Sequence, residues 1–363
     1  MFRKCTCQYV PPHIMGRILR NASPLLNVKP ESLESMRRTE VSAKSIRAYR
    51  IQDVSAKSHR LIKEQAAEGE DEAAEAGAPS AARYVYDCQS LNQQQVDLIR
   101  GEGDPVSNDF DGDTVYKSAG IVRDFFRNVL GRDSIDDASM DIILNVHYGQ
   151  NYGNAFWDGD EMTFGDGDGD VFTSFAQSLD VVAHELAHGV TQFTANLDYW
   201  SQSGALNEHF SDVFGSAITQ FYLNQDANSA DWLIGNEIMG PTLAGETLRS
   251  MKAPGTAYSN ALMGDDPQPA HMDNYYTGAG DNQGVHINSG IPNRVFYLVA
   301  TDQLGTERAA QLWYNTLQNL WPTAEFADFA YVLISTAQVL TGQRVLPQGT
   351  TQSVRMALKD VGL

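Results

Sequence analysis

Apolar residues recur along this chain at two different spacings, which predict where helices and strands form. Residues 115–130 carry Val, Ile, Phe and Leu at helical spacing, and Gly131 follows as a typical helix C-terminus. Residues 142–148 form an apolar run that is typical of a buried strand, and another strand begins at residues 84–86. We therefore expect both strands and a helix in the first half of the chain.

The pattern in the last quarter of the chain is helical instead. Three segments carry apolar residues at a period of 3.6, namely 292–304, 308–320 and 326–340. Trp313, Tyr314 and Tyr331 stand among these apolar positions, and we expect them in the core. Together the two halves predict an α+β protein.

The beginning of the chain differs in composition from the rest. Pro11 and Pro12 open a short apolar stretch that predicts a helix, and residues 31–41 predict another. Residues 64–82 are dominated by Ala, Glu and Gly, which is typical of a solvated linker. A short segment (residues 1–55), an acidic low-complexity linker that holds the maturation region (56–82) and a large body suggest a precursor. We call residues 1–55 the pro-segment.

Size and charge narrow the function classes. A length of 363 residues suggests two domains with a large core. The formal net charge of −20 argues against nucleic acid or anionic membranes as partners. We expect a monomer.

The cysteines and the N-terminus bear on the compartment. Cys5, Cys7 and Cys88 are odd in number and predict no disulfide framework. Cys5 and Cys7 are too close for an ordinary bridge, so they are a metal or redox feature or two incidental thiols. The first 20 residues lack a continuous apolar core, which argues against a Sec signal peptide and for a cytoplasmic start, with any export by another route.

The main chemical signal is a pair of histidines four residues apart. His184 and His188 stand in an apolar stretch with helical spacing, so both side chains share one helix face. Two imidazoles placed in this way bind one zinc ion. Glu185 lies to one side of them, where it reaches a metal-bound water without being a ligand.

A catalytic zinc site needs a third protein ligand, and Glu208 is the candidate. Residues 191–204 are rich in Thr, Asn, Ser and Gln and predict a turn, after which residues 205–222 predict a second helix. Asn207 and Asp212 on that helix would orient the imidazoles through their other ring nitrogens. An accidental His-Glu-x-x-His on a surface helix is the alternative.

These motifs resemble those of the thermolysin-like zinc metallopeptidases, the gluzincins. The resemblance covers residue 84 to the C-terminus and includes three further sequences: Asn-Ala-Phe-Trp at 154–157, Gly-Ala-Leu-Asn-Glu at 204–208 and Asp-Asn-Gln-Gly-Val-His at 281–286. It implies a two-lobe fold, with a β-rich lobe (83–196) that ends in the zinc helix and a helical lobe (197–363). The Pro-Pro sequence at 11–12 resembles that of protealysin-like members, which have a short propeptide.

The resemblance also implies a mechanism. A zinc-activated water would attack the peptide carbonyl, and Glu185 would act as general base. His286 and Tyr199 would stabilise the developing negative charge, and Asp281 would favour the protonated form of His286. The pro-segment would restrain the active site, with His13, Cys5 or Cys7 touching the zinc as one variant of this hypothesis.

Substrate-binding residues follow from the same resemblance. Asn154 and Ala155 lie on an edge strand that pairs with the substrate backbone. Arg249 would hold the substrate near the cut bond as well as a carboxylate. Apolar positions match a pocket for the residue after the cut bond, which predicts cleavage before bulky apolar residues: Phe172, Phe175, Val181, Ile234, Ile238 and Leu248.

Calcium is a weaker expectation. Residues 165–170 alternate Gly and Asp, but they lack the Gly and Glu positions of an EF-hand loop and predict a tight turn. Asp180 and Asp231 match calcium ligands of the family, whereas Gln220, Leu233 and Asn236 stand where acidic ligands are expected. We expect one weak calcium site or none.

Two other functions stay open at this point. One is a catalytically silent peptidase scaffold that acts as a binding protein, against which the intact Glu185, His286 and ligand set argue. The other is an enzyme held permanently as its precursor. His147, His209 and His271 are interpreted as structural or surface residues.

Overall fold

The computed structural model describes residues 7–22, 28–50 and 81–363, and for residues 43–50 it describes the main chain alone. Most of the predicted linker and Cys5 therefore lie outside the described residues. The described helices include none that is long and apolar enough to cross a membrane.

A six-stranded mixed sheet forms the β-rich lobe, in the order β1-β5-β6-β4-β2-β3. Its strands are β1 (Cys7–Gln8), β2 (Arg83–Asp87), β3 (Asp97–Arg100), β4 (Ile142–Val146), β5 (Ala155–Trp157) and β6 (Met162–Phe164). Every residue of β4 is buried, as its apolar run predicts. β1 belongs to the pro-segment and pairs antiparallel with β5, so it covers the edge expected to receive substrate.

Helix α4 (Phe110–Leu130) packs against β2 and β4 and against the helix that carries the histidine pair. It begins five residues before the apolar pattern does, because the Asp109 side chain accepts a hydrogen bond from the Gly112 nitrogen and caps it. It ends at Gly131, whose φ of 70° is left-handed and favours glycine.

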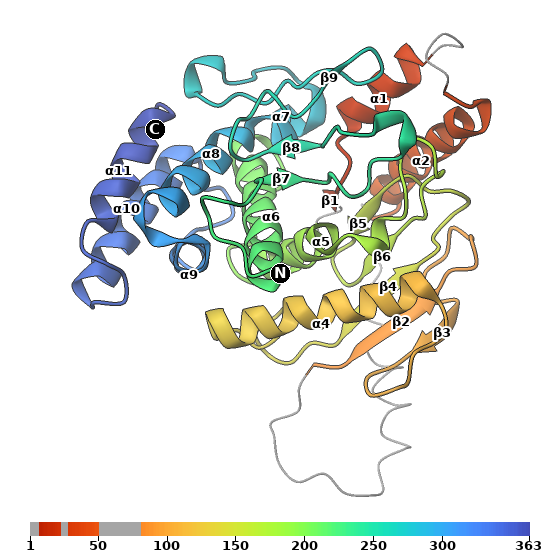
Figure 1. Cartoon of the computed structure of the whole chain (residues 1–363), viewed down its shortest axis with the longest axis horizontal. Helices are drawn as coiled ribbons and strands as arrows, with labels where there is room; N and C mark the ends of the chain where they lie inside the picture. Colours follow the sequence, from red (N-terminus) through yellow and green to blue (C-terminus); the bar gives the residue numbers. More distant parts are fainter. Residues whose placement is uncertain (1–6, 23–27, 51–80) are drawn as a thin grey trace, which may run out of the picture.

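Two helices cross at the centre of the molecule, α5 (Leu179–Gln192) and α6 (Ser201–Tyr222) (Figure 1). The predicted turn is shorter than expected, because α6 begins at Ser201 rather than at residue 205. Gly204 fits inside the first turn of α6, where a Cβ would lie 2.5 Å from the Val285 side chain. Polar composition alone predicted a turn there, and the close approach of Val285 explains why residue 204 is a glycine.

The C-terminal lobe is helical, as predicted, and lies on the opposite side of α6 from α1 and α2 in Figure 1. It contains α7 (Gly280–Asn288), α8 (Gly290–Val299), a π-helical turn (Ala300–Leu304), α9 (Thr306–Leu317), α10 (Phe326–Gly342) and α11 (Thr350–Asp360). Trp313 and Tyr314 are buried. The prediction for Tyr331 was wrong, because α10 turns Phe329 and Leu333 inward and leaves Tyr331 73% exposed.

The pro-segment folds against both lobes through α1 (Pro12–Asn21) and α2 (Pro30–Arg50) (Figure 1). Ile14, Met15 and Ile18 of α1 are buried in the main core. Short elements complete the structure: β7 (Leu233–Ile234) with β8 (Arg249–Ser250), β9 (Ser259–Asn260) with β10 (Gly264–Asp265), and 3-10 turns at Phe175–Gln177, Pro241–Leu243 and Met272–Asn274.

Candidate metal centre and active site

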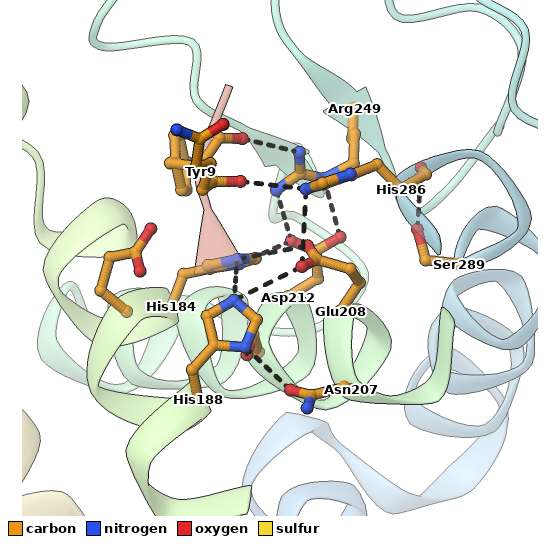
Figure 2. Close-up of polar contacts among 12 residues, drawn as sticks. Tyr9, His184, His188, Asn207, Glu208, Asp212, Arg249, His286 and Ser289 are labelled. Carbon is orange, nitrogen blue, oxygen red and sulfur yellow. Dashed lines mark hydrogen bonds and ion pairs between the residues drawn. The ribbon is translucent and has the colours of Figure 1, made fainter. Parts of the chain in front are cut away.

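His184 and His188 on α5 face Glu208 on α6 in a buried cluster (Figure 2). The two Nε2 atoms are 3.0 Å apart. Oε2 of Glu208 lies 3.5 Å from Nε2 of His184, and Oε1 lies 3.5 Å from Nε2 of His188. The i and i+4 spacing on one helix and the crossing of α6 thus bring together the three predicted ligands.

This donor set fits a zinc ion. Two imidazole nitrogens and one carboxylate are a common ligand set of catalytic zinc. Oε2 of Glu208 is buried and accepts no hydrogen bond from the described residues, although it lies beside His184. A bound cation would supply the partner that this oxygen lacks.

The outer nitrogens of both imidazoles have the partners predicted for them. Nδ1 of His184 lies 3.0 Å from Oδ1 of Asp212, and Nδ1 of His188 lies 2.8 Å from Oδ1 of Asn207. These contacts leave both Nε2 atoms directed at Glu208.

Arg249 is the fixed partner of Asp212. Its Nε and Nη2 donate to the two carboxylate oxygens at 2.9 and 2.7 Å, as Figure 2 shows. Both side chains are buried. Burial alone would raise the pKa of Asp212, but the charge of Arg249 and the hydrogen bond from His184 outweigh it and hold that pKa well below its usual range.

Glu185 lies beside the cluster without joining it. It is fully buried, and its Oε2 accepts a hydrogen bond of 2.7 Å from the Trp157 nitrogen of β5. Its Oε1 has no hydrogen-bond partner among the described residues. Burial raises the pKa of Glu185 to about 8, so the carboxyl group binds a proton readily.

His286 lies above Glu208 with a carboxylate behind it. Its Nδ1 lies 2.6 Å from Oδ1 of Asp281, and its main-chain nitrogen donates to the other oxygen at 2.9 Å. Four successive residues from Asp281 to Gly284 have left-handed φ angles, a tight turn that lets the two side chains meet. Burial opposes protonation of His286, but the charges of Asp281 and Glu208 outweigh it and raise its pKa.

Tyr199 completes this side of the cluster. Its hydroxyl donates to Oε1 of Glu208 and lies 3.1 Å from Nε2 of His286. The Tyr199 hydroxyl and the His286 imidazole thus lie together beside Glu208, one of the three candidate metal ligands.

The pro-segment lies across these groups as an extended strand. The Tyr9 nitrogen donates to the Ala155 oxygen at 3.1 Å, and the Val10 nitrogen donates to Oδ1 of Asn154 at 2.8 Å. The side-chain amide of Asn154 returns a hydrogen bond of 3.2 Å to the Val10 oxygen. Asn154 and Ala155, which were predicted to bind the substrate backbone, therefore bind the backbone of the pro-segment.

Two further contacts hold this strand at the cluster. Nε2 of His286 lies 2.9 Å from the Gln8 oxygen. Nη1 of Arg249 donates to the Tyr9 oxygen at 3.4 Å, in addition to its ion pair. Both expectations for Arg249, a carboxylate partner and a backbone partner, thus have a contact in the structure.

The Tyr9 side chain fills a pocket beside His184 and is fully buried (Figure 2). Its ring lies edge-on to that of His184, at 5.0 Å between centroids, and to that of Phe175, at 6.5 Å. Phe175, one of the six residues predicted to line the substrate pocket, therefore lies against Tyr9, and all six are buried in the main core: Phe172, Phe175, Val181, Ile234, Ile238 and Leu248. Sequence reasoning did not identify Tyr9, although it stands two residues before the Pro-Pro sequence.

Asp180 and Asp231, the two calcium candidates, belong to no group of three or more metal-binding side chains among the described residues. Among the described residues, the groups of three or more His, Cys, Asp or Glu side chains close enough to share an ion are the zinc candidates and a group of Asp111, His147 and Asp166. Asp180 instead accepts hydrogen bonds from the Ser178 hydroxyl and from the Gly235 nitrogen at 2.7 Å. Asp231 is exposed.

The other predicted pro-segment contacts to zinc are not found among the described residues. Nε2 of His13 lies 3.5 Å from the Tyr258 hydroxyl. Cys7 is disulfide-bonded, so the expectation of incidental thiols was wrong for it. Cys88 is buried and reduced, and burial raises the pKa of its thiol to about 12.

The fold and the cluster of His184, His188 and Glu208 are those of a metallohydrolase with one candidate metal centre. Residues 40–192 match the family model described as "Thermolysin metallopeptidase, catalytic domain", and residues 195–363 match "Thermolysin metallopeptidase, alpha-helical domain". The chain therefore belongs to the thermolysin family of metallopeptidases, which is zinc-dependent, and it is a metalloendopeptidase.

Individual relatives agree with this assignment. The chain is 42% identical to an "Extracellular metalloprotease" of Pectobacterium carotovorum subsp. carotovorum, over 89% of this chain and 88% of that protein. It is 40% identical to a "Thermolysin" of Alicyclobacillus acidocaldarius subsp. acidocaldarius, over 68% of this chain and 44% of that protein. A solved structure of the precursor of protealysin from Serratia proteamaculans has a TM-score of 0.82 and 37% identity, over 98% of this chain and 99% of that chain. The predicted resemblance and fold class are confirmed.

Proposed function

We propose that this metalloendopeptidase hydrolyses peptide bonds on the N-terminal side of bulky apolar residues, with Glu185 as general base. We also propose that its pro-segment holds it latent. The observation that carries both statements is the strand of the pro-segment, which lies along β5 with the Gln8 oxygen at His286 and the Tyr9 side chain in the apolar pocket.

The zinc ligands are proposed to be His184, His188 and Glu208. Zinc bound there would supply a Lewis acid that polarises a peptide carbonyl and acidifies water. Glu185 stands beside this position and has a free carboxylate oxygen, so it would take a proton from the attacking water and deliver it to the leaving amine.

His286 and Tyr199 are proposed to stabilise charge on the substrate carbonyl. The Gln8 oxygen lies 2.9 Å from Nε2 of His286, which is the distance of a hydrogen bond to a carbonyl. Asp281 would keep that imidazole protonated and oriented, so that it meets the developing negative charge as a cation.

Substrates are proposed to bind β5 as the pro-segment does. The Ala155 main-chain oxygen and the Asn154 side-chain amide would bind the substrate backbone, and Arg249 would hold the carbonyl of the residue after the cut bond. An apolar pocket favours bulky apolar residues at that position through burial of their surface.

Latency rests on competition, because one edge strand cannot pair with pro-segment and substrate together. Side-chain contacts outside the site hold the pro-segment in place. Lys29 pairs with Asp170 at 3.4 Å, and the Thr39 hydroxyl accepts a hydrogen bond of 2.9 Å from the Gly153 nitrogen. We propose residues 1–55 as the inhibitory part, residues 56–82 as the region cut during maturation, and residues 83–196 and 197–363 as the two lobes.

The test is to digest an unfolded protein with the full chain and with the chain activated by limited proteolysis. Mass spectrometry of the peptides identifies the residue after each cut. We expect cuts before bulky apolar residues, made by the activated form. Equal cutting before Asp or Lys would contradict the pocket assignment. No cutting by an activated, zinc-loaded chain would favour a silent scaffold that acts as a binding protein.

Calcium and location complete the proposal. We expect one weak calcium site or none, because Asp180 is already bonded and Asp231 is exposed. Adding millimolar calcium should therefore leave the melting temperature nearly unchanged, and a large rise would contradict this. An extracellular site of action is proposed from the name of the Pectobacterium relative, and assay of culture medium against cell extract tests it.

A further inference from the structure

The apolar pocket that holds Tyr9 has a carboxylate at its end. The Tyr9 hydroxyl donates to Oδ2 of Asp180 at 3.1 Å. The same oxygen accepts from the Gly235 nitrogen at 2.7 Å, and the other oxygen accepts from the Ser178 hydroxyl. Asp180 is 7% exposed, so these donors replace nearly all of its contact with water.

The walls of the pocket fit a flat ring. The rings of His184 and Phe175 lie nearly perpendicular to that of Tyr9, at interplanar angles of 87° and 82°, and the Arg249 guanidinium lies 5.4 Å from the Tyr9 ring centre. Gly235 forms another wall, where a Cβ would lie 3.2 Å from Cε1 of Tyr9. The φ of Gly235 is 75°, which also favours glycine there.

We propose that Asp180 is a specificity-determining residue that makes this pocket selective for tyrosine after the cut bond. The inference rests on the proposed function, because it assumes that a substrate side chain enters the pocket as Tyr9 does. The substrate class is then a peptide with Tyr in that position, in preference to Phe or Leu.

The physical reason is the buried oxygen at the end of the pocket. A Tyr side chain gives Oδ2 of Asp180 a hydrogen bond to replace the water that binding expels, whereas Phe of the same shape leaves that oxygen with the Gly235 nitrogen alone. Sites built to bind a hydroxyl discriminate strongly against the analogue that lacks it, because the buried partner loses a bond.

A lysine could also reach a carboxylate at this depth, but burial of its charge opposes it. Arg249 faces the Tyr9 ring, and its own charge is buried with that of Asp212. A lysine ammonium would have to lose its water beside this guanidinium, which costs more than burial of a neutral phenol. Glu237 lies near Asp180, and its Oε2 lies 3.0 Å from the Ser178 hydroxyl oxygen that also contacts Asp180.

The first test uses the chain activated by limited proteolysis and matched peptides that differ only after the cut bond. The residues compared are Tyr, Phe, O-methyltyrosine, Leu and Lys. We expect kcat/KM for Tyr to exceed that for Phe by about tenfold, with O-methyltyrosine no better than Phe. Asp180→Asn should reduce the Tyr to Phe ratio at least threefold, whereas Asp124→Asn, an exposed change of the same kind on α4, should not alter it.

The outcomes separate the two claims. Equal cleavage before Tyr and Phe, or faster cleavage before Lys, would overturn the inference and leave the peptidase intact. Failure to cleave every peptide would overturn the proposed function itself.

A second test needs no activity and uses the full chain. In Tyr9→Phe, the main-chain amides of residues 9 and 10 should exchange hydrogen about tenfold faster. The reason is that the strand loses the hydrogen bond from the Tyr9 hydroxyl to Asp180. Asp180→Asn should speed the exchange of these amides to a similar extent. Combining Asp180→Asn with Tyr9→Phe should speed the exchange little further. Tyr331→Phe is the matched control, since that side chain is exposed. Exchange in Tyr9→Phe at the wild-type rate would overturn the inference.

Discussion

Nε2 of His286 lies 2.9 Å from the main-chain oxygen of Gln8, so the imidazole assigned to a substrate carbonyl contacts a carbonyl of the pro-segment. The contact joins residues 278 positions apart in the sequence. If the proposed function is correct, the contact that keeps the enzyme latent is made by the same imidazole that acts in catalysis, so variants of His286 should affect both.

The Tyr9 side chain should be the main anchor of this latent state. Tyr9→Ala removes a fully buried ring and leaves the pocket open, which costs roughly 3 kcal/mol or about a hundredfold in the equilibrium for strand release. We expect the uncut full chain to gain peptidase activity in that proportion, measured with a fluorogenic peptide while the intact mass is followed.

The matched control is Val41→Ala, in α2 of the same pro-segment, where the side chain is 62% exposed. It should leave the uncut chain as inactive as the wild type. Latency that is equally strong in Tyr9→Ala would show that the pro-segment does not act through this pocket.

The ion pair between Arg249 and Asp212 should be a large single contribution to stability. Arg249→Met leaves a carboxylate that is fully buried, with two donors remaining from His184 and Asn293. Breaking a buried pair in this way costs about 3 kcal/mol. Urea denaturation of the full chain measures the loss.

The control for this prediction is an exposed ion pair. Arg127→Met breaks the pair with Asp133, whose side chains are 36% and 40% exposed, and should cost less than about 1 kcal/mol. Equal losses of unfolding free energy in Arg249→Met and Arg127→Met would contradict a larger contribution from the buried ion pair.

His147 predicts how stability depends on pH. Its ring nitrogens lie 2.8 Å from Asp166 and 3.0 Å from Asp109. The hydrogen bond to Asp166 is the largest influence and outweighs burial, so the pKa of His147 rises from 6.5 to about 9. The folded state favours the charged imidazole, so this stabilisation is fully present below pH 6.5 and is lost as pH rises through about 9.

We therefore expect the stability difference between the wild type and His147→Gln to shrink from pH 6.5 to pH 9, as measured by urea midpoints. In an Asp166→Asn background, where the principal partner carries no charge, the difference should vary less with pH. A difference that stays constant across this range would contradict the charged pair.

The sequence predicted which residues cluster at the candidate metal centre because the constraints on them are local. His184 and His188 share a helix face by spacing alone, and each side chain of that face has its partner on the next helix. The apolar runs of β4 and α4 likewise carry their own signal of burial.

The remaining features depend on which surfaces meet. Tyr331 has the same apolar character as Tyr314, and only the packing of α10 leaves it exposed. Asp180 matches a calcium position in sequence, yet the structure places its carboxylate at the end of a pocket filled by a residue 171 positions away. Neither outcome follows from a local pattern, because both are set by contacts between distant segments.

The central claim is that this site hydrolyses peptides with Glu185 as its base. The most direct measurement compares Glu185→Ala with the wild type after limited proteolysis, with azocasein hydrolysis and zinc content determined on both. We predict one zinc per chain in both proteins, and a loss of activity of at least 100-fold in the variant. A variant that binds zinc and still cleaves azocasein at the wild-type rate would contradict the account.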